Sequence, residues 1–237
     1  DIKVADRIVI SNRIIADTIT FNEIEFFTNS ISTKTSGVDV VINYQNIRFA
    51  SGVLGLSVAG NVNLINERDG KIPKVRGFDK SDSTFKGINV IDATQEALFF
   101  TSRPKEKFIV GATYEMGKIS ATLNNTYFGS TEFRQSGMST DLKTVFAPKV
   151  VTDVNLSYAF DDNISLSVNV DNILNVIPTW KFEALNANGK EILKDAAKKK
   201  EQSNLITFNQ RYSIMTYDGF HFSQLGTLFN VGLTYKF

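Results

Sequence analysis

The chain of 237 residues contains no cysteine and only one histidine, and these absences exclude several kinds of site. Without cysteine there are no disulfides, no thiolate zinc sites and none of the usual scaffolds of small secreted domains. Basic and acidic residues nearly balance, 26 against 25, so charge gives no reason to expect nucleic-acid binding. No G-x-S-x-G nucleophile elbow occurs, and one histidine does not make a catalytic triad. We therefore expect that the protein is not an enzyme and has no nucleic-acid partner.

The chain also lacks a run of roughly 18 apolar residues, which excludes a transmembrane helix. It does not exclude a transmembrane β-barrel, whose alternating strands are not hydrophobic on average. Apolar residues at 42% and charged residues at 22% are typical of a folded protein, and the length fits one all-β domain. The chain begins at Asp1 with neither a methionine nor a signal peptide, from which we expect that an upstream part has been removed.

Eight segments alternate between apolar and polar residues, the pattern of a strand with one apolar and one hydrated face. In the last of them, GTLFNVGLTYKF, the apolar positions are Phe229, Val231, Leu233, Tyr235 and Phe237. The predicted strands are 6–11, 38–46, 54–64, 107–116, 118–128, 150–160, 163–171 and 226–237. The first of these fits the pattern least well.

The connections between these strands alternate strictly in length. The short connections are 47–53, 115–118 and 161–163, and the long ones are 12–37, 65–106, 129–149 and 172–227. Outer-membrane barrels have short periplasmic turns and long external loops, whereas soluble sandwiches show no such alternation. We therefore predict an all-β fold, an antiparallel up-and-down transmembrane β-barrel, with a soluble β-sandwich as the alternative. In the barrel an aromatic girdle at the periplasmic rim would contain Tyr114, Tyr158, Phe160, Tyr235 and Phe237.

The predicted lumen face is lined mostly by small and polar side chains. Its members include Ser57, Ala59, Asn61, Ser120, Thr122, Ser165, Ser167 and Gly232. A closed eight-stranded barrel has a narrow interior that bulky side chains fill, so these residues favour a wider, hydrated lumen. In a wider barrel the two outer strands must pair with further strands, because hydrocarbon does not tolerate unpaired backbone groups.

Several stretches resemble the TonB-dependent outer-membrane receptors, in particular those of the Bacteroidota type. NISLSVNVDNILNVIPTW at 163–180 is similar to their penultimate strand, and RYSIMTYDGFHFSQLGTLFNVGLTYKF at 211–237 to their last loop and terminal strand. The order of DRIVIS, FFTNSISTKTSGVDVVINY, RPKEKFIVGATYEMGKISATLNNTYFGSTEF and VVTDVNLSYAF resembles the same family. The resemblance implies that residues 1–237 are the C-terminal part of a barrel of about 22 strands, without the plug domain and the TonB box.

A receptor of this family would bind a scarce nutrient at its outer face and import it when the inner-membrane TonB complex rearranges the plug. The resemblance implies an iron–siderophore complex, haem, cobalamin or a glycan as the nutrient. It also implies the outer membrane of a Gram-negative bacterium, with lipid and lipopolysaccharide, the rest of the barrel and the plug as partners, and no bound cofactor or metal. The alternative is a self-contained eight-stranded barrel that acts as an anchor or adhesin.

Ligand contacts are expected in the long loops, at 67–103, 132–147 and 176–227. The candidate ligand-binding residues are His221, Tyr217, Asp218 and Trp180. His221 would contact an iron complex or haem, or else is a solvated or loop-packed imidazole. Trp180, with Phe182, is alternatively part of the outer aromatic belt.

The lysine-rich stretch EILKDAAKKKEQ at 191–202 predicts a short surface helix within the last long loop. Such a helix either contacts lipopolysaccharide phosphates or is a solvated face. Asp161 and Asp162 belong to a hairpin turn, where Asp-Asp-Asn is ordinary turn chemistry and not an acid/base pair.

Overall fold

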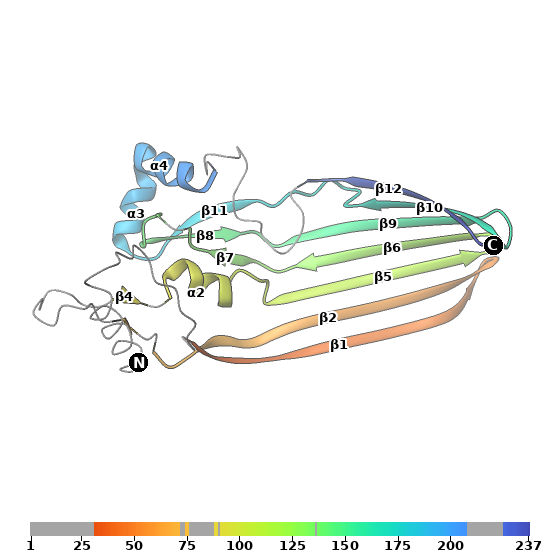
Figure 1. Ribbon diagram of the computed structural model, residues 1–237, viewed down its shortest axis with the longest axis horizontal. Helices are drawn as coiled ribbons and strands as arrows, with labels where there is room; N and C mark the ends of the chain where they lie inside the picture. The colour runs from red at the N-terminus through yellow and green to blue at the C-terminus, as the bar shows by residue number, and fades with distance from the viewer. Residues whose placement is uncertain (1–30, 72–73, 76–87, 90, 136, 208–224) are drawn as a thin grey trace, which may run out of the picture.

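The chain folds into one large antiparallel sheet with a smaller layer beyond one end of it (Figure 1). The computed structural model describes residues 31–71, 74–75, 88–89, 91–135, 137–207 and 225–237. The seven-stranded sheet has the order β1-β2-β5-β6-β9-β10-β12. Its strands are β1 (Ser32–Phe49), β2 (Gly52–Asp69), β5 (Glu106–Met116), β6 (Ile119–Phe128), β9 (Lys149–Ala159), β10 (Ile164–Asp171) and β12 (Leu228–Tyr235).

Seven of the eight predicted strands are confirmed, as is the up-and-down arrangement in which each strand pairs with the next one of the sheet. The remaining prediction, 6–11, lies outside the described residues. No helix in the described part of the chain is long and apolar enough to cross a membrane.

The alternation of short and long connections is confirmed from β1 onward, while most of the first predicted long connection, 12–37, lies outside the described residues. The connections at 50–51, 117–118 and 160–163 lie together at one end of the sheet, which we call the turn end (Figure 1). The described residues of the connections 70–105, 129–148 and 172–227 lie at the opposite end, the loop end. Consecutive strands therefore run in opposite directions, and the long connections leave the sheet at one end only.

β1 and β2 are much longer than predicted, at 18 residues each. A tilted strand needs only about 9–11 residues to cross a bilayer, and β5, β6 and β9 have 11, 10 and 11. Pairing of β2 with β5 stops at Val62↔Glu106, followed by one bond from the Asn63 N–H to the Lys105 carbonyl at 2.7 Å, and beyond it β1 and β2 pair only with each other. The predicted ends at 38 and 64 were wrong because the residues beyond them are all polar or glycine except Ile65, so no apolar alternation marks them as strand.

The register aligns residues of one kind in rows across the sheet. One row, over β5, β6, β9, β10 and β12, contains Ala112, Leu123, Val154, Val170 and Phe229. A neighbouring row over the same strands contains Thr113, Thr122, Asn155, Asn169 and Asn230. The sheet thus has one apolar face and one polar face, as the alternation predicted.

Nothing in the described part of the chain covers the apolar face. Phe229, Val231 and Leu233 of β12 are 74%, 67% and 72% exposed. A β-sandwich would bury this face against a second sheet, so the soluble-sandwich alternative was wrong. An apolar face of this extent is the surface that a barrel presents to lipid.

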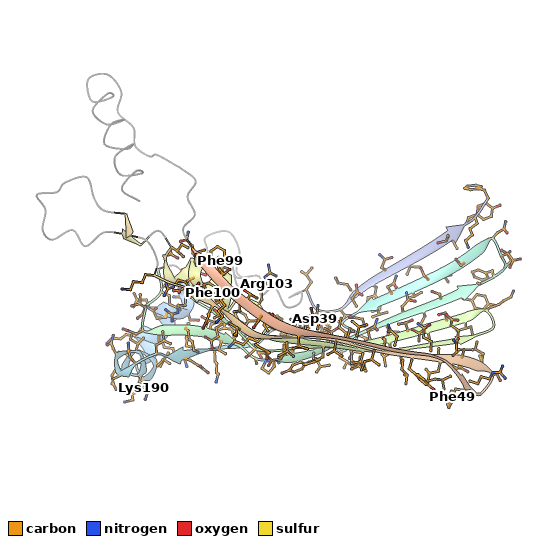
Figure 2. All side chains as sticks on the ribbon, turned by 90° about the horizontal axis from the view of Figure 1, so that it is seen from below. Asp39, Phe49, Phe99, Phe100, Arg103 and Lys190 are labelled. Carbon is orange, nitrogen blue, oxygen red and sulfur yellow. The ribbon has the colours of Figure 1, made fainter. Side chains whose placement is uncertain are left out.

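Aromatic residues are paired at the turn end, as predicted for a girdle. Ring centroids lie 6.2 Å apart in Phe49–Tyr114, 5.0 Å in Tyr158–Phe160 and 5.1 Å in Tyr235–Phe237. Figure 2 labels Phe49 at this end of the sheet, far from Phe99, Phe100 and Lys190 at the other. The predicted girdle thus gains Phe49 as a further member.

The sheet is open among the described residues, because β1 and β12 are each paired on one side only. The outer edges of these two strands carry backbone N–H and C=O groups without a partner strand. In hydrocarbon each such group costs several kcal/mol, so both edges require a backbone partner.

Substitutions at two glycines of β2 test how tightly the sheet is packed near the turn end. A Cβ on Gly52 would lie 2.7 Å from a ring carbon of Tyr114 and still closer to the carbonyl oxygen of Glu115, whereas a Cβ on Gly55 would have no neighbour closer than 3.8 Å. We predict that Gly52→Ala lowers the free energy of unfolding by about 1–3 kcal/mol. Gly55→Ala, the matched control, should leave it unchanged or raise it by up to about 1 kcal/mol. Denaturant unfolding of the protein in detergent measures both, and equal effects of the two changes would contradict this packing.

Candidate functional site

The long connections fold into a structured layer beyond the loop end, which we call the external layer (Figure 1). It contains a three-stranded sheet of order β11-β8-β7, formed by β7 (Thr131–Phe133), β8 (Leu142–Phe146) and β11 (Trp180–Ala184). It also contains α2 (Ala93–Phe100), α3 (Ala187–Lys194), α4 (Ala196–Thr207) and the short hairpin β3 (Lys74–Val75) and β4 (Ile88–Asn89). The regions where ligand contacts were expected are therefore largely folded.

The single helix predicted at 191–202 is in fact two helices, α3 and α4, separated at Asp195. Asp195 has an extended backbone, with φ −84° and ψ 113°. Its carboxylate accepts hydrogen bonds from the backbone N–H groups of Ala197 at 2.9 Å and Lys198 at 3.2 Å. Asp195 thus ends one helix and caps the start of the next, so the prediction of one helix was wrong.

One face of the three-stranded sheet forms a small core. Leu142, Thr144 and Phe146 alternate along β8 and are at most 1% exposed. Trp180 packs against both buried clusters of this layer, one around Phe146 and one around Leu142. The outer-belt interpretation of Trp180 was therefore wrong, because the loops form a sheet of their own whose apolar face the indole helps to cover.

The opposite face of this sheet carries charges of alternating sign. The Lys143 ammonium lies 2.6 Å from Glu132 and 3.6 Å from Glu183, and Lys181 lies 2.9 Å from Glu183. A hydrogen bond from Lys181 is the main cause that lowers the pKa of the Glu183 carboxyl below its ordinary value. These ion pairs are accessible to water, so each contributes little stability, and their alternation mainly keeps this face free of excess charge.

α3 is attached to the start of β8 through Asp141. The Asp141 carboxylate accepts hydrogen bonds from the amides of Asn186, at 2.6 Å, and Asn188. These bonds lower the pKa of Asp141. A Cβ on Gly189 would overlap the Asp141 carbonyl oxygen, so only glycine allows α3 to approach β8 this closely.

α2 connects the projecting end of β2 to the edge of β7. On one side Arg68 of β2 lies 3.2 Å from Glu96, and the Asn66 amide donates to the Phe100 carbonyl at 3.2 Å. On the other side the Thr101 hydroxyl donates to the Glu132 carbonyl at 2.9 Å, and the Glu132 N–H donates to the Thr101 carbonyl at 2.8 Å. α2 is thus bonded to β2 on one side and to β7 on the other, from its middle and its C-terminal end.

A hollow of about 320 Å³ lies where α2, β2, β7 and β8 meet, and we call it the α2 hollow. Few apolar residues line it, mainly Ala93, Ala97 and Phe100. Its charged lining consists of Glu67, Arg68, Glu96, Glu132, Arg134 and Lys143. No sequence motif marks this site, because its residues come from separate segments that only the fold brings together.

A second hollow, of about 390 Å³, lies on the polar face of the main sheet towards the turn end. Its polar lining consists of Asn43, Gln45, Asn46, Ser57, Thr113 and Glu115. The register of β1 shifts here between Tyr44 and Ile47, and Asn46 has a positive φ of 65°, as in a β-bulge. Its neutral amides and hydroxyls fit a hydrated lumen wall.

The long connection 172–227 is closed at its base by a turn at residues 172–176, which we call the asparagine turn. The Asn172 side chain, only 5% exposed, accepts from the Val176 N–H at 2.8 Å and donates to the Val176 carbonyl at 2.7 Å. The Asn175 side chain accepts from the Thr227 N–H, and the Thr227 hydroxyl donates to the Asn172 carbonyl at 2.7 Å. These bonds fix the end of β10 beside the start of β12.

Three of the four predicted ligand-binding residues, His221, Tyr217 and Asp218, lie outside the described residues. The fourth, Trp180, is half-buried in the core of the external layer and does not line the α2 hollow. No group of three His, Cys, Asp or Glu residues in the described ranges is arranged to hold a metal ion.

Comparison with protein families gives one match. Residues 2–173 match the family model described as TonB-dependent receptor-like, β-barrel. The matched part contains every strand of the main sheet except β12. No match was found among curated proteins or among solved structures.

Asn172 has two roles in the turn: its side chain bonds to the backbone of Val176, and its own backbone has a positive φ of 54°. Two substitutions separate these roles. We predict that Asn172→Gly lowers the free energy of unfolding by about 1–3 kcal/mol, because both backbone groups of Val176 lose their partner. Asn172→Ala should cost roughly 1 kcal/mol more, because alanine is strained at a positive φ. Denaturant unfolding in detergent measures both, and an alanine variant as stable as the glycine variant would show that the turn is not held in this conformation.

Proposed function

The chain belongs to the family of TonB-dependent receptor-like β-barrels, and on this premise we propose that it forms part of a receptor that takes up a scarce nutrient. Members of this family are outer-membrane transporters and not enzymes. In the proposed receptor the apolar face of the main sheet contacts lipid and the polar face lines the lumen. The external layer lies on the outer side, where the nutrient arrives.

The observation that carries this proposal is the combination of the uncovered apolar face with a folded layer at one end only. A lipid-facing wall accounts for exposed apolar side chains such as Phe229, Val231 and Leu233 of β12. The folded layer accounts for the length of the connections at the loop end, since a simple anchor would need only turns there.

We also propose that residues 1–237 are the C-terminal part of a barrel of about 22 strands. The unpaired outer edges of β1 and β12 support a barrel with more strands than the described part supplies. The likeness of 211–237 to a terminal strand supports the C-terminal position. The plug, its TonB-contacting segment and the remaining wall would come from elsewhere in the receptor.

Because the sequence resembles receptors of the Bacteroidota type, we propose that the receptor is of this type. On the same ground we propose that its nutrient is an iron–siderophore complex, haem, cobalamin or a glycan. His221, Tyr217 and Asp218 remain proposed contacts in the last loop. The self-contained eight-stranded anchor receives no support from the described residues, where β12 pairs only with β10.

Uptake by whole cells tests the proposal. Cells that carry the receptor are supplied with labelled ferric siderophore, haem, cobalamin or oligosaccharide, with and without a working TonB complex. We expect that one nutrient accumulates only with both the receptor and the TonB complex, whereas its binding at the cell surface needs the receptor alone. Accumulation of every nutrient at the same rate without the receptor or without the TonB complex would contradict the proposal.

A matched pair of variants links this uptake to the external layer. Trp180→Ala removes the indole that packs on both small cores, so binding should fall while the receptor still inserts in the membrane. Trp180→Phe keeps an aromatic ring at this position and should retain most of the binding.

A further inference from the structure

The second hollow, on the polar face towards the turn end, has a glycine at its centre, and we call it the Gly55 hollow. Gly55 of β2 pairs with Thr113 of β5, a member of the polar row, so it occupies a position of the polar face. On its other side two residues of β1, Gln45 and Asn46, lie opposite it, because the register of β1 shifts here. The hollow is therefore the space that a side chain of β2 would otherwise occupy, widened by the bulge in β1.

The polar side chains around Gly55 point to the same face of the sheet. Ser57 lies two residues along β2 from Gly55 and pairs with Asn43 of β1. Glu115 lies two residues after the β5 residue that pairs with Gly55. Residues two apart on a strand share a face, as do residues that pair directly. The Cγ atom of Gln45 is the atom nearest to where a Cβ of Gly55 would lie, at 3.8 Å. These side chains thus form a ring around the glycine.

Most of this ring has no partner within the described part of the chain. Its members without a side-chain hydrogen bond or ion pair there are Asn43, Gln45, Ser57 and Glu115. Further across the sheet polar side chains bond to one another instead, as the hydroxyls of Thr113 and Thr122 do at 3.1 Å. The donors and acceptors of the ring are therefore available to a ligand.

The chemistry of the ring suits a neutral molecule rich in hydroxyl groups. Each amide, such as that of Asn43 or Gln45, has one acceptor oxygen and two donor hydrogens, and the Ser57 hydroxyl both donates and accepts. A sugar hydroxyl also does both, so neighbouring hydroxyls of one ring can bond to an amide through its two ends. Of the residues that line the hollow, Glu115 is the one with a charge, and no basic residue is among them. An anionic ligand is therefore disfavoured.

Three of the four proposed nutrients fit this hollow poorly. Its volume of about 390 Å³ is near the lower end for small-molecule sites, about 300–1,000 Å³, so cobalamin is too large for it. Haem is a broad apolar ring system that carries carboxylates, whereas the apolar lining is limited to Val53 and Leu56. Ferric siderophore complexes are commonly anionic and would be repelled by Glu115. A segment of a glycan meets none of these obstacles.

We propose that the Gly55 hollow binds a sugar unit of an oligosaccharide on its way through the lumen. Asn43 and Gln45 bond to neighbouring hydroxyls, and the Glu115 carboxylate accepts from another. Because Gly55 has no side chain, the sugar ring can approach the backbone of β2 closely. The inference rests on the proposed function, for which it names a glycan as the nutrient.

The test measures binding of maltose, cellobiose and lactose to the complete receptor in detergent, by isothermal titration. We expect at least one of them to bind, and its permethylated form, which has no hydroxyl donors, not to bind. Gly55→Gln fills the hollow and should weaken binding by about tenfold or more. Ala59→Gln, the matched control, adds the same side chain to the same face of β2 about 13 Å away and should change nothing.

A second pair of variants removes one amide each. Asn43→Ala should weaken binding by about three- to tenfold, because the sugar loses its hydrogen bonds to this side chain. Asn230→Ala removes the same group from the polar face of β12, outside the hollow, and should have no effect. This pair keeps the test decisive if Gly55→Gln does not fold, which denaturant unfolding of each variant reveals.

Glu115→Gln distinguishes a sugar from a cation in the hollow. Glutamine still accepts a hydrogen bond from a hydroxyl, so sugar binding should weaken by no more than about threefold. A loss of tenfold or more would show that the hollow is a site for a cation and would contradict the inference.

Binding of none of the three sugars, or binding that Gly55→Gln and Asn43→Ala both leave unchanged, would overturn the inference. The uptake experiment separates this result from a failure of the proposed function. TonB-dependent uptake of any nutrient that persists while no sugar binds would reject only the sugar site. Loss of any dependence on the TonB complex would reject the transport function itself, whatever the sugars do.

Discussion

The structure depends on one constraint, which is that a backbone surrounded by hydrocarbon must have every N–H and C=O group paired within the protein. Pairing along the whole strand fixes the register, and the register places Leu123 beside Val154 and Asn155 beside Asn169 in separate rows. The apolar face, the polar face and the short turns all follow from this constraint. The same constraint makes β1 and β12 incomplete on their outer edges.

Beyond the loop end the constraint is relaxed, because water can satisfy backbone groups and charges. There β1 and β2 continue without alternation, and the connections form the external layer with its own core around Phe146 and Leu142. Charged side chains such as Arg68 and Glu96 are stable at this depth and would be costly within the bilayer. The α2 hollow, which is lined by charges, lies in this part of the chain beyond the loop end.

The strands that could be predicted from the sequence are those with lipid on one face and water on the other. Alternation over ten residues located β5, β6, β9 and β10, because a lipid face leaves little freedom at every second position. The strand β8 alternates in the same way, but its five residues are too few for such a pattern to stand out. The break between α3 and α4 had a signal in Asp195, a residue that favours helix caps over helix interiors. The α2 hollow had none, since it depends on how distant segments pack, and His221 stays a prediction.

Site-directed spin labelling along β10 tests most directly whether the two faces of the sheet meet lipid and water. The chain has no cysteine, so a single cysteine placed at Leu166, Ser167, Val168 or Asn169 is the only one in this segment. In the receptor in a bilayer, we predict that labels at 166 and 168 are accessible to oxygen, which concentrates in lipid, and those at 167 and 169 are not. Labels that show no alternation, or that prefer a water-soluble relaxant at 166 and 168, would contradict the membrane-spanning sheet.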